Sequence, residues 1–393
     1  MLTSGMAEQR KSQMLLVLRL LLGMLVAFLL LFSSFLGATF FAGWMLPLLF
    51  IQPLWYRVLL DSLVDLWKCY AASLLELLLG IKVVITGDQI KPGERCLLIM
   101  NHRTRLDWMY FWSVLVRHSG VKREKIILKT PLKHIPGAGW AMQVGTFIFI
   151  RRRWEDDKKV LQKMLDYFAD LKYRVQVLLF PEGTDFTEGS KASSDRFASK
   201  NNLPKLEQVL HPRTTGFNYI TQKMRDNGML EAIYDVTVAY PYNFPQNETG
   251  LVLGNFPKEV HFHIKRHPVD TLPETEEGLA QWCQDRWSDK ERKLTQFHKD
   301  KSFEPGKKSK DKTAGGKNPK MMLWIAFTYW TLFVIGILVI LWYSWLARWF
   351  LIFQVTFYLI MGFRDGFEFF QVDMFYRLWS GRKRDDFQKS KSQ

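Results

Sequence analysis

The feature of this sequence that most limits its fold is a pair of long apolar stretches, one toward each end. Residues 14–32 contain one charged side chain, Arg19, and residues 321–343 contain none. Each stretch is long enough to cross the hydrocarbon of a bilayer as a helix, because about 20 apolar residues suffice. Arg19 lies near the start of its stretch, from which its side chain can extend to the headgroups. The sequence therefore predicts a membrane protein with transmembrane helices in both its N-terminal and C-terminal parts.

A shorter apolar run accompanies each of these stretches. Residues 36–51 are interrupted by a proline and are barely long enough to cross, so they either span or enter and return beside the first segment. Residues 349–363 would form a hairpin with residues 321–343 and return the tail to the side where it began. The first stretch lacks a small-residue cleavage site, which favours an anchor, with a cleaved signal peptide as the alternative.

Residues 54–79 are predicted to form a helix of another kind. Its charged side chains, at helical spacings, are Arg57, Asp61, Asp65, Lys68 and Glu76. They fall within an arc of about 100°. Such a helix either lies on the membrane with its remaining face in lipid or against the preceding helices, or packs as an ordinary amphipathic helix on a core. Residues 1–80 are therefore expected to form an N-terminal membrane anchor and an interfacial helix.

The charge balance favours lipid over nucleic acid as a partner. The chain has 54 Lys and Arg against 38 Asp and Glu, a net charge of +16, and 15% aromatic residues. A soluble protein with this balance can bind nucleic acid, but long uncharged runs point to a membrane, whose anionic headgroups attract the same charge. The three cysteines are scattered, which argues against a disulfide framework or a zinc site and suits a reducing compartment. Oligomeric state leaves no trace in the sequence.

Residues 81–267 have the alternation of short strands and amphipathic helices that is typical of an α/β domain. The candidate strands are residues 83–86, 97–100, 126–128, 146–150, 175–180, 235–239 and 260–264. Residues 154–171 form the clearest helix between them, with apolar side chains on one stripe. The pattern predicts a largely parallel or mixed sheet flanked by helices.

The chain becomes more charged after this domain. Residues 268–320 are expected to contain a polar helix over residues 275–297 and a basic linker over residues 301–320, which is rich in lysine and predicted to be disordered. Residues 321–393 would then form the C-terminal transmembrane hairpin and a cytosolic tail.

The segment from Asn101 to Asp107 contains the first candidate catalytic pair. It directly follows a strand, so His102 should emerge where that strand ends. His102 and Asp107 would lie about 140° apart on a continuous helix, so they can meet only if the chain turns. Asp107 would then accept a hydrogen bond from one ring nitrogen and leave the other free to take a proton. The alternative is a surface histidine beside a helix start.

A second strand opens directly into a polar turn, Pro181-Glu182-Gly183-Thr184. The order Asn-His-x4-Asp followed by Phe-Pro-Glu-Gly-Thr resembles the glycerolipid acyltransferase family, which acylates lysophospholipids and glycerol phosphate. With residues 211–217, His-Pro-Arg-Thr-Thr-Gly-Phe, the string is most similar to the lysocardiolipin-acylating members. The resemblance implies an α/β acyltransferase domain in which His102 is the general base and Asp107 orients it.

The resemblance also implies residues that bind substrate. The family's second motif, Phe-Ile-x-Arg, fits Phe149 to Arg152 and makes Arg152 a phosphate ligand. Its usual glycine is replaced by Thr146, which leaves Arg151 as the alternative. A solvated or headgroup-facing arginine patch is the plainer interpretation of Arg151 to Arg153. Lys129 and Arg213 are further candidate phosphate contacts.

The third motif implies that Glu182, Gly183 and Thr184 help to bind the acyl acceptor, with Glu182 fixing an arginine or accepting a substrate hydroxyl. The family often has arginine next, whereas this chain has Asp185, which puts phosphate binding there in doubt. Residues 238–241 resemble the fourth motif, which packs near the acyl-donor channel.

The function implied is transfer of a fatty acyl group from acyl-CoA, as co-substrate, to lysocardiolipin or another anionic lysolipid such as lysophosphatidylinositol or lysophosphatidylglycerol. A CoA-independent transacylase and a non-catalytic membrane scaffold are the alternatives. No bound cofactor is expected, and no metal, because His261 and His263 have no carboxylate or cysteine partner nearby in the sequence. Lysines 389 and 391 resemble an endoplasmic reticulum retrieval signal, so the catalytic domain is expected to face the cytosol, with the glycosylation sequence at Asn247 unmodified.

Overall fold

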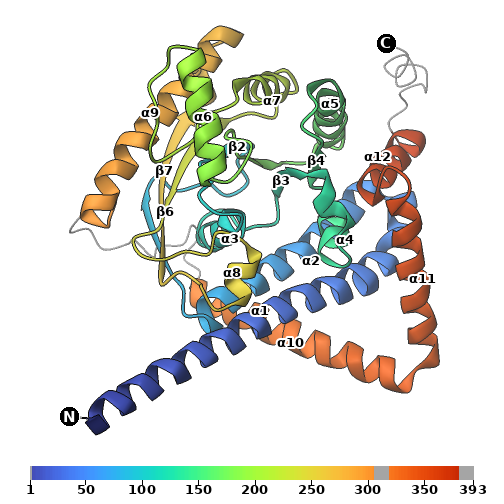
Figure 1. Ribbon diagram of the computed structural model, residues 1–393. Helices are drawn as coiled ribbons and strands as arrows, with labels where there is room; N and C mark the ends of the chain where they lie inside the picture. Colours follow the sequence, from blue (N-terminus) through green and yellow to red (C-terminus); the bar gives the residue numbers. More distant parts are fainter. Residues whose placement is uncertain (1, 305–317, 380–393) are drawn as a thin grey trace.

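The computed structural model describes residues 2–304 and 318–379 of the chain, and its centre is a seven-stranded mixed sheet (Figure 1). Each of the seven predicted strands is present. The strands are β1 (Lys82–Gly87), β2 (Cys96–Met100), β3 (Glu124–Lys129), β4 (Ile148–Ile150), β5 (Gln176–Leu179), β6 (Ala232–Ala239) and β7 (Glu259–Pro268). β4 begins later than expected because Thr146, with φ 51°, is in the left-handed region and ends a turn.

Strand direction decides where the site can form. The order is β1-β7-β6-β2-β5-β3-β4, and the only antiparallel pair among these strands is β6 with β7. The five strands from β6 to β4 therefore all point the same way. Their carboxyl ends meet at one edge of the sheet, the usual place for a binding site in such folds.

Helices cover both faces of the sheet and make three layers. They are α3 (Asp107–Arg117), α4 (Ala138–Val144), α5 (Trp154–Asp170), α6 (Glu188–Lys200), α7 (Thr214–Asp226), α8 (Glu248–Val252) and α9 (Glu276–Asp300), with short 3-10 turns at Thr130–His134 and Val269–Thr271. α3 packs on one face, and α5, α7 and α9 pack on the other. The predicted polar helix is α9, which places Cys283 and Trp287 in the core and so belongs to this fold.

The N-terminal part is one helix, α1 (Leu2–Ile51), with Pro47 near its end. The expectation of two separate segments was therefore wrong. Ser33 and Ser34 lie where a break was expected, but their hydroxyls donate to carbonyls three residues earlier and are satisfied within the helix. Residues Ser12–Ile51 are long and apolar enough to cross a membrane. At 1.5 Å per residue they extend about 60 Å, roughly twice the hydrocarbon thickness.

Arg19 does not extend away from the protein as expected. Its guanidinium donates to the Phe256 carbonyl at 3.1 Å and lies over the Phe256 ring. Helix α1 and the segment from Leu251 to Phe256 can approach closely here because each has a glycine at the contact. A Cβ at Gly23 would come within 2.4 Å of the Leu251 carbonyl oxygen, and one at Gly254 within 2.7 Å of the Arg19 backbone. The loop around α8 is therefore fixed to α1.

The predicted helix over residues 54–79 is α2 (Pro53–Ser73) followed by a π-helical turn (Leu74–Leu78), and its charged face is turned inward. Arg57 pairs with Asp61 at 2.6 Å, and Asp61 also pairs with Lys125 of β3 at 2.7 Å. Lys68 pairs with Glu124 at 3.1 Å. Of the two alternatives, a helix lying on the membrane with its charged face outward was therefore wrong, because these charges have buried counter-charges on β3.

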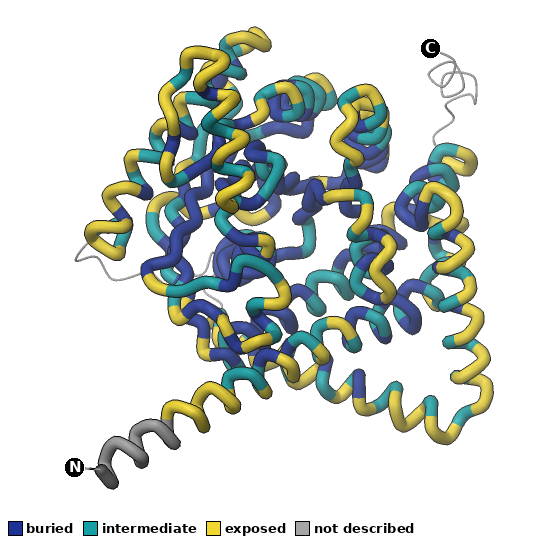
Figure 2. Tube along the Cα trace, in the orientation of Figure 1, coloured by how far each residue is buried: buried dark blue, intermediate teal, exposed yellow. Residues whose placement is uncertain are grey.

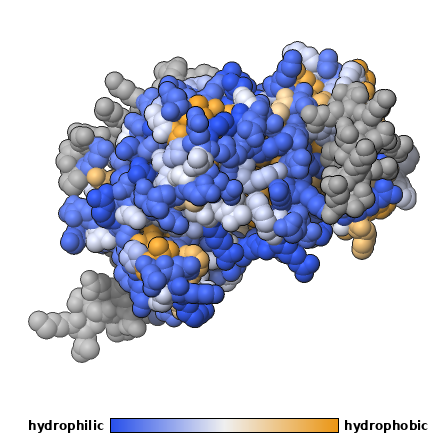
Figure 3. All heavy atoms as spheres, turned by 90° about the horizontal axis from the view of Figure 1, so that it is seen from above, coloured by the Kyte–Doolittle hydropathy of each residue, from blue (hydrophilic) through white to orange (hydrophobic). Residues whose placement is uncertain are grey.

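The C-terminal part adds α10 (Pro319–Tyr343), α11 (Trp345–Gly362) and α12 (Phe367–Leu378). α10 and α11 are both long and apolar enough to cross a membrane. Figure 1 shows them diverging in a wide V instead of lying side by side as a hairpin. Figure 2 shows both as largely exposed tubes, in contrast to the buried strands. The face over α5, α6, α7 and α9, seen from above in Figure 3, is mostly hydrophilic.

α12 was not predicted, since this segment was assigned to a free tail. Its Gln371 side chain is fully buried and contacts three partners. It accepts from Tyr56 at 3.1 Å and Arg57 at 3.2 Å, and it donates to the Gln143 carbonyl at 3.0 Å. The last described helix is therefore tied to α2 and α4. The predicted retrieval signal and most of the basic linker lie outside the described residues.

Candidate active site

The carboxyl edge of the sheet gathers the predicted site residues. His102 follows β2, Glu182 follows β5, Lys129 ends β3 and Arg152 follows β4. Each is delivered by a buried parallel strand, which explains how residues far apart in sequence come together.

His102 and Asp107 form the contact that the sequence predicted. His102 Nδ1 lies 3.0 Å from Asp107 Oδ2. The Asp107 carboxylate is fully buried, whereas the His102 side chain keeps 16% of its surface exposed. The Phe180 ring packs 4.2 Å from the imidazole, centroid to centroid. This arrangement leaves Nε2 available to accept a proton from a group in the adjoining cavity.

The turn between these two residues has a local cause. The Thr104 backbone N–H donates to Asp107 Oδ2 at 2.9 Å, and the Leu106 N–H donates to the Thr104 hydroxyl at 2.9 Å. Asp107 then begins α3, where a carboxylate is favoured by the helix dipole. The Asn101 side chain exchanges two hydrogen bonds with the Val238 backbone and so ties the end of β2 to β6.

Tyr240 is a third member of this group that the sequence did not reveal. Its hydroxyl donates to Asp107 Oδ1 at 2.6 Å, so each carboxylate oxygen has its own side-chain partner. Tyr240 comes from the segment that resembles the fourth motif, which was expected near the acyl-donor channel. It instead contacts the carboxylate that orients the imidazole.

A cavity of about 840 Å³ opens beside His102. Its polar end is lined by His102 together with Arg105, Lys129, Arg152, Thr184 and Arg213. Most of its remaining wall is apolar and comes from α1, α2, α3 and the loop before α4. An amphiphilic substrate requires a polar site beside an apolar compartment, and this cavity contains both.

Three cations at the polar end form what we call the cation cluster: Lys129, Arg152 and Arg213. None of the three forms an ion pair with a carboxylate in the described part of the chain, although the Asp185 carboxylate, which pairs with Arg105, is near enough to oppose the lowering of the pKa of Lys129 and Arg152. Partial burial, and then Arg152, lower the pKa of Lys129, and partial burial, and then Arg213, lower the pKa of Arg152. Like charges held this close to one another favour an anionic ligand.

Gly183 explains how two of these guanidinium groups reach the same place. It has φ 73°, and its carbonyl oxygen accepts from Arg152. A Cβ at Gly183 would lie 3.4 Å from the Arg213 side chain. The Arg213 backbone N–H also donates to the Pro181 carbonyl at 2.8 Å. Arg213 thus places a guanidinium beside this turn. The turn itself has Asp185 at the position where the family often has arginine.

The structure separates the two arginine candidates of the second motif. Both side chains are exposed, but Arg152 lines the cavity and Arg151 does not. The Arg151 backbone N–H donates to Asp157 at 2.7 Å. Arg152 has φ 64°, and this left-handed step turns its side chain toward Gly183 while its neighbours point elsewhere.

Glu182 forms no ion pair with an arginine of the described chain and does not line the cavity, so only its predicted contact with a substrate hydroxyl stays a prediction. It is 3% exposed, and its Oε1 accepts from the His102 backbone N–H at 3.3 Å and from Trp287 Nε1 at 3.1 Å. Burial raises the pKa of Glu182 to about 8, although both N–H groups favour the carboxylate. Glu182 therefore positions the His102 backbone and attaches α9 to the site.

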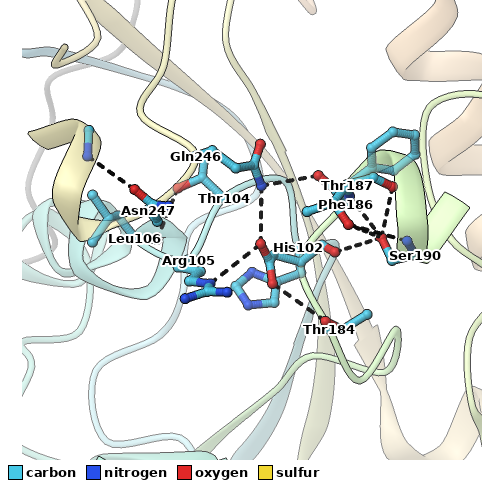
Figure 4. A network of polar contacts seen from close by, with 12 residues as sticks. His102, Thr104, Arg105, Leu106, Thr184, Phe186, Thr187, Ser190, Gln246 and Asn247 are labelled. Atoms are coloured by element: carbon cyan, nitrogen blue, oxygen red, sulfur yellow. Dashed lines mark hydrogen bonds and ion pairs between the residues drawn. The ribbon is translucent and has the colours of Figure 1, made fainter.

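Gln246 lies in a network of polar contacts that holds the loops around the site together (Figure 4), and Asp185 is one of its partners. Gln246 Nε2 donates to Asp185 Oδ2 and to the Phe186 carbonyl, both at 3.1 Å. Arg105 lies 3.7 Å from the same carboxylate. Burial opposes ionisation, but the Gln246 hydrogen bond, with help from the nearby His102 and Arg105, keeps the pKa of Asp185 below its usual range. Asp185 therefore anchors a cation and a loop, and it leaves phosphate binding to other residues.

No group of three or more metal-ligating side chains occurs within residues 2–304 and 318–379. His261 contacts Glu259 at 3.1 Å, and His263 contacts the Thr86 hydroxyl at 3.0 Å. These contacts each occupy one ring nitrogen, and Glu259 is a nearby carboxylate partner of His261 that sequence reasoning overlooked.

Comparisons with known proteins show which proteins this chain is similar to. A family model described as acyltransferase matches residues 82–241, and one described as acyltransferase C-terminus matches residues 250–328. Lysocardiolipin acyltransferase 1 of Gallus gallus is 48% identical over 326 residues, 81% of this chain and 85% of that protein. Lysophosphatidylinositol acyltransferase 10 of Caenorhabditis elegans is 40% identical over 332 residues, 81% and 84% of the two chains. The crystal structure of the 1-acyl-sn-glycerophosphate acyltransferase PlsC from Thermotoga maritima aligns with a TM-score of 0.45 and 16% identity, over 70% of this chain and 96% of that one.

Proposed function

Because this chain belongs to the acyltransferase family, we propose that it transfers a fatty acyl group from acyl-CoA to a hydroxyl of an anionic lysophospholipid. The observation that carries the proposal is the His102–Asp107 pair at the edge of a cavity that also contains the cation cluster. A scaffold would have no need of a buried carboxylate on one ring nitrogen and an open second nitrogen.

The proposed reaction needs one base and no covalent intermediate. His102 Nε2 takes the proton of the lipid hydroxyl as its oxygen attacks the thioester carbonyl carbon. The C–S bond then breaks, and the proton passes from His102 to the departing CoA thiolate. Asp107 keeps the Nδ1 proton in place and stabilises the imidazolium, while Tyr240 steadies Asp107. A positioned base of this kind contributes roughly 10² to 10⁴ in rate.

The cation cluster supports an acceptor with an anionic headgroup. The names of two relatives refer to lysocardiolipin and lysophosphatidylinositol, and both of these lipids are anionic. The three cations of the cluster form no ion pair in the described chain and are therefore available to contact phosphate groups. Lysocardiolipin, with two phosphates, and lysophosphatidylinositol are therefore the acceptors we place first, and lysophosphatidylglycerol follows.

The test uses the purified full-length protein, labelled acyl-CoA and a panel of anionic and zwitterionic lysophospholipids. We expect acyl-CoA-dependent product with the anionic acceptors, and a loss of roughly 10² or more with His102→Ala. His134→Ala is the matched control, because His134 is exposed and does not line the cavity. Product formed from a diacyl phospholipid without acyl-CoA would indicate the transacylase, and unchanged product with His102→Ala would refute the assigned base.

We further propose that the protein resides in the endoplasmic reticulum membrane with its catalytic domain in the cytosol. The lysines at positions 389 and 391 support this location, and three apolar helices support the membrane. The Asn247 side chain accepts from the Gly250 N–H at 3.0 Å and caps α8, so this sequon is engaged within the fold. Glycosidase treatment of protein from cells should leave its mobility unchanged, whereas a glycan at Asn247 would reverse the orientation.

A further inference from the structure

The cavity has a second end, which lies among the membrane helices and away from His102. Its walls there include Leu30, Ser34 and Phe41 of α1 and Leu63, Val64 and Trp67 of α2. Of the described lining residues, only Trp330 comes from α10. α10 packs mainly against α2 and lies on the side of α1 and α2 that faces away from the sheet (Figure 1). Trp330 therefore belongs to the end of the cavity that is distant from the strand ends.

The Trp330 ring is fixed by aromatic packing. The side chain is only 2% exposed. The rings of Phe41 and Phe333 meet it edge to face, with centroids 5.6 and 5.0 Å away, and Tyr70 lies 6.2 Å away on α2. The indole Nε1 has no hydrogen-bond partner in the described part of the chain. Packing alone therefore holds the ring. Replacing Trp330 with an apolar residue would break no hydrogen bond of the described chain.

Gly37 of α1 is what allows the ring to sit there. A Cβ at Gly37 would come within 2.8 Å of Trp330 Cη2 and 3.2 Å of Cζ3. Contacts this short are not tolerated, so any larger residue would displace the indole. Both residues also line the cavity, which makes the Gly37–Trp330 contact part of its wall.

We propose that Trp330, seated on Gly37, is the end wall of the acyl-chain compartment and sets the longest fatty acyl chain that the enzyme accepts. This inference rests on the proposed acyltransferase function, in which the apolar compartment holds the chain being transferred. Each methylene group of the acyl chain that fits into the compartment adds favourable apolar burial. A chain that is one methylene too long must displace the packed indole or fold back on itself. A membrane helix distant from the base would then select the substrate by length.

The test is a competition assay on the full-length protein in nanodiscs, with one lysophospholipid and an equimolar mixture of saturated acyl-CoAs from 12 to 22 carbons, roughly the natural range. Products are resolved by mass. We expect Trp330→Leu to raise the ratio of products longer than the wild-type optimum by roughly tenfold for two extra carbons. Gly37→Ala should also change the ratio, because its methyl group would displace the indole that forms the end wall. Trp330→Phe serves if the leucine variant does not fold.

Two substitutions on α10 are matched controls. Trp342→Leu removes an indole that is 77% exposed, and Gly336→Ala adds a Cβ that meets nothing within 4 Å. Neither residue lines the cavity, so both variants should keep the wild-type distribution. If the Trp330 and Gly37 variants are active and give the wild-type distribution of products, the inference about Trp330 is overturned while the proposed acyltransferase function stands. If the wild type requires a phospholipid donor instead of acyl-CoA, the proposed donor fails, and the same variants with donors of graded chain length decide the inference.

Discussion

Glu182 offers the sharpest test of how the site is built, because its charge and its shape can be separated. Its side chain accepts hydrogen bonds from the backbone of His102 and from the indole of Trp287. With a pKa raised by burial to about 8, the group is mainly neutral at pH 7. Glutamine has the same shape and presents the same acceptor oxygen. Glu182→Gln should therefore keep kcat/KM within about threefold at pH 7, since both hydrogen bonds remain.

Glu182→Ala has a different effect, because it leaves both N–H groups buried without an acceptor. Each such donor costs about 1–3 kcal/mol, so we expect a free energy of unfolding lower by about 2–6 kcal/mol. Glu182→Ala should also lose activity, because the His102 backbone N–H is no longer held by the Glu182 carboxyl group. Glu188→Gln is the control substitution, since Glu188 is exposed on α6.

The pH dependence of stability provides an independent check. The folded pKa of Glu182, about 8, lies above its ordinary value of 4.5, so the folded state favours the neutral form. The stability contributed by this group is fully present below about pH 4.5 and is lost as pH rises through about 8. The difference over that window is up to about 5 kcal/mol, at 1.36 kcal/mol per pKa unit.

The assay compares thermal unfolding in nanodiscs at several pH values between about 5 and 9, together with kcat/KM. The stability of the wild type relative to Glu182→Gln should fall as pH rises, because glutamine does not ionise. The reasoning is refuted if Glu182→Gln loses as much activity as Glu182→Ala, or if the stability difference is independent of pH.

Two further predictions concern the carboxylate and the cation cluster. Tyr240→Phe removes a hydrogen bond to Asp107 and should lower kcat/KM roughly tenfold or more. Tyr110→Phe should not, because the Tyr110 hydroxyl has no partner in the described chain; equal losses would contradict the role of Tyr240. Arg213→Ala should raise the KM for an anionic lysophospholipid roughly tenfold. Arg153→Ala should leave the KM unchanged, because Arg153 does not line the cavity. A raised KM for Arg153→Ala and an unchanged KM for Arg213→Ala would show that the phosphate binds elsewhere.

The strand ends and the His102–Asp107 contact were predictable because their signals are local. An apolar run of strand length followed by a polar turn marks where a side chain emerges, and with four residues between them His102 and Asp107 can meet only if the chain turns. Partners that come from distant segments gave no such signal. Tyr240 and Trp287 reach the site through β6 and α9, and only the strand order explains why they meet Asp107 and Glu182.

The charged stripe of α2 shows a second limit of sequence reasoning. A run of charges at helical spacing indicates that one face is polar, but it does not reveal what that face contacts. Its partners Glu124 and Lys125 lie in β3, where their neighbours are apolar. The same ambiguity affected α12, whose buried Gln371 and Glu368 looked like residues of a solvated tail.

The attachment of α12 bears on when the protein can finish folding as it is synthesised. The Arg57 guanidinium donates to the Gln371 side chain, more than 300 residues later, as well as to the Val144 carbonyl and the Thr146 hydroxyl. Until Gln371 has been synthesised, this buried guanidinium lacks one of its hydrogen bonds, and the Gln143 carbonyl of α4 lacks the one that Gln371 donates. We therefore expect the α/β unit to reach its final packing only after the membrane helices α10 and α11 have been made.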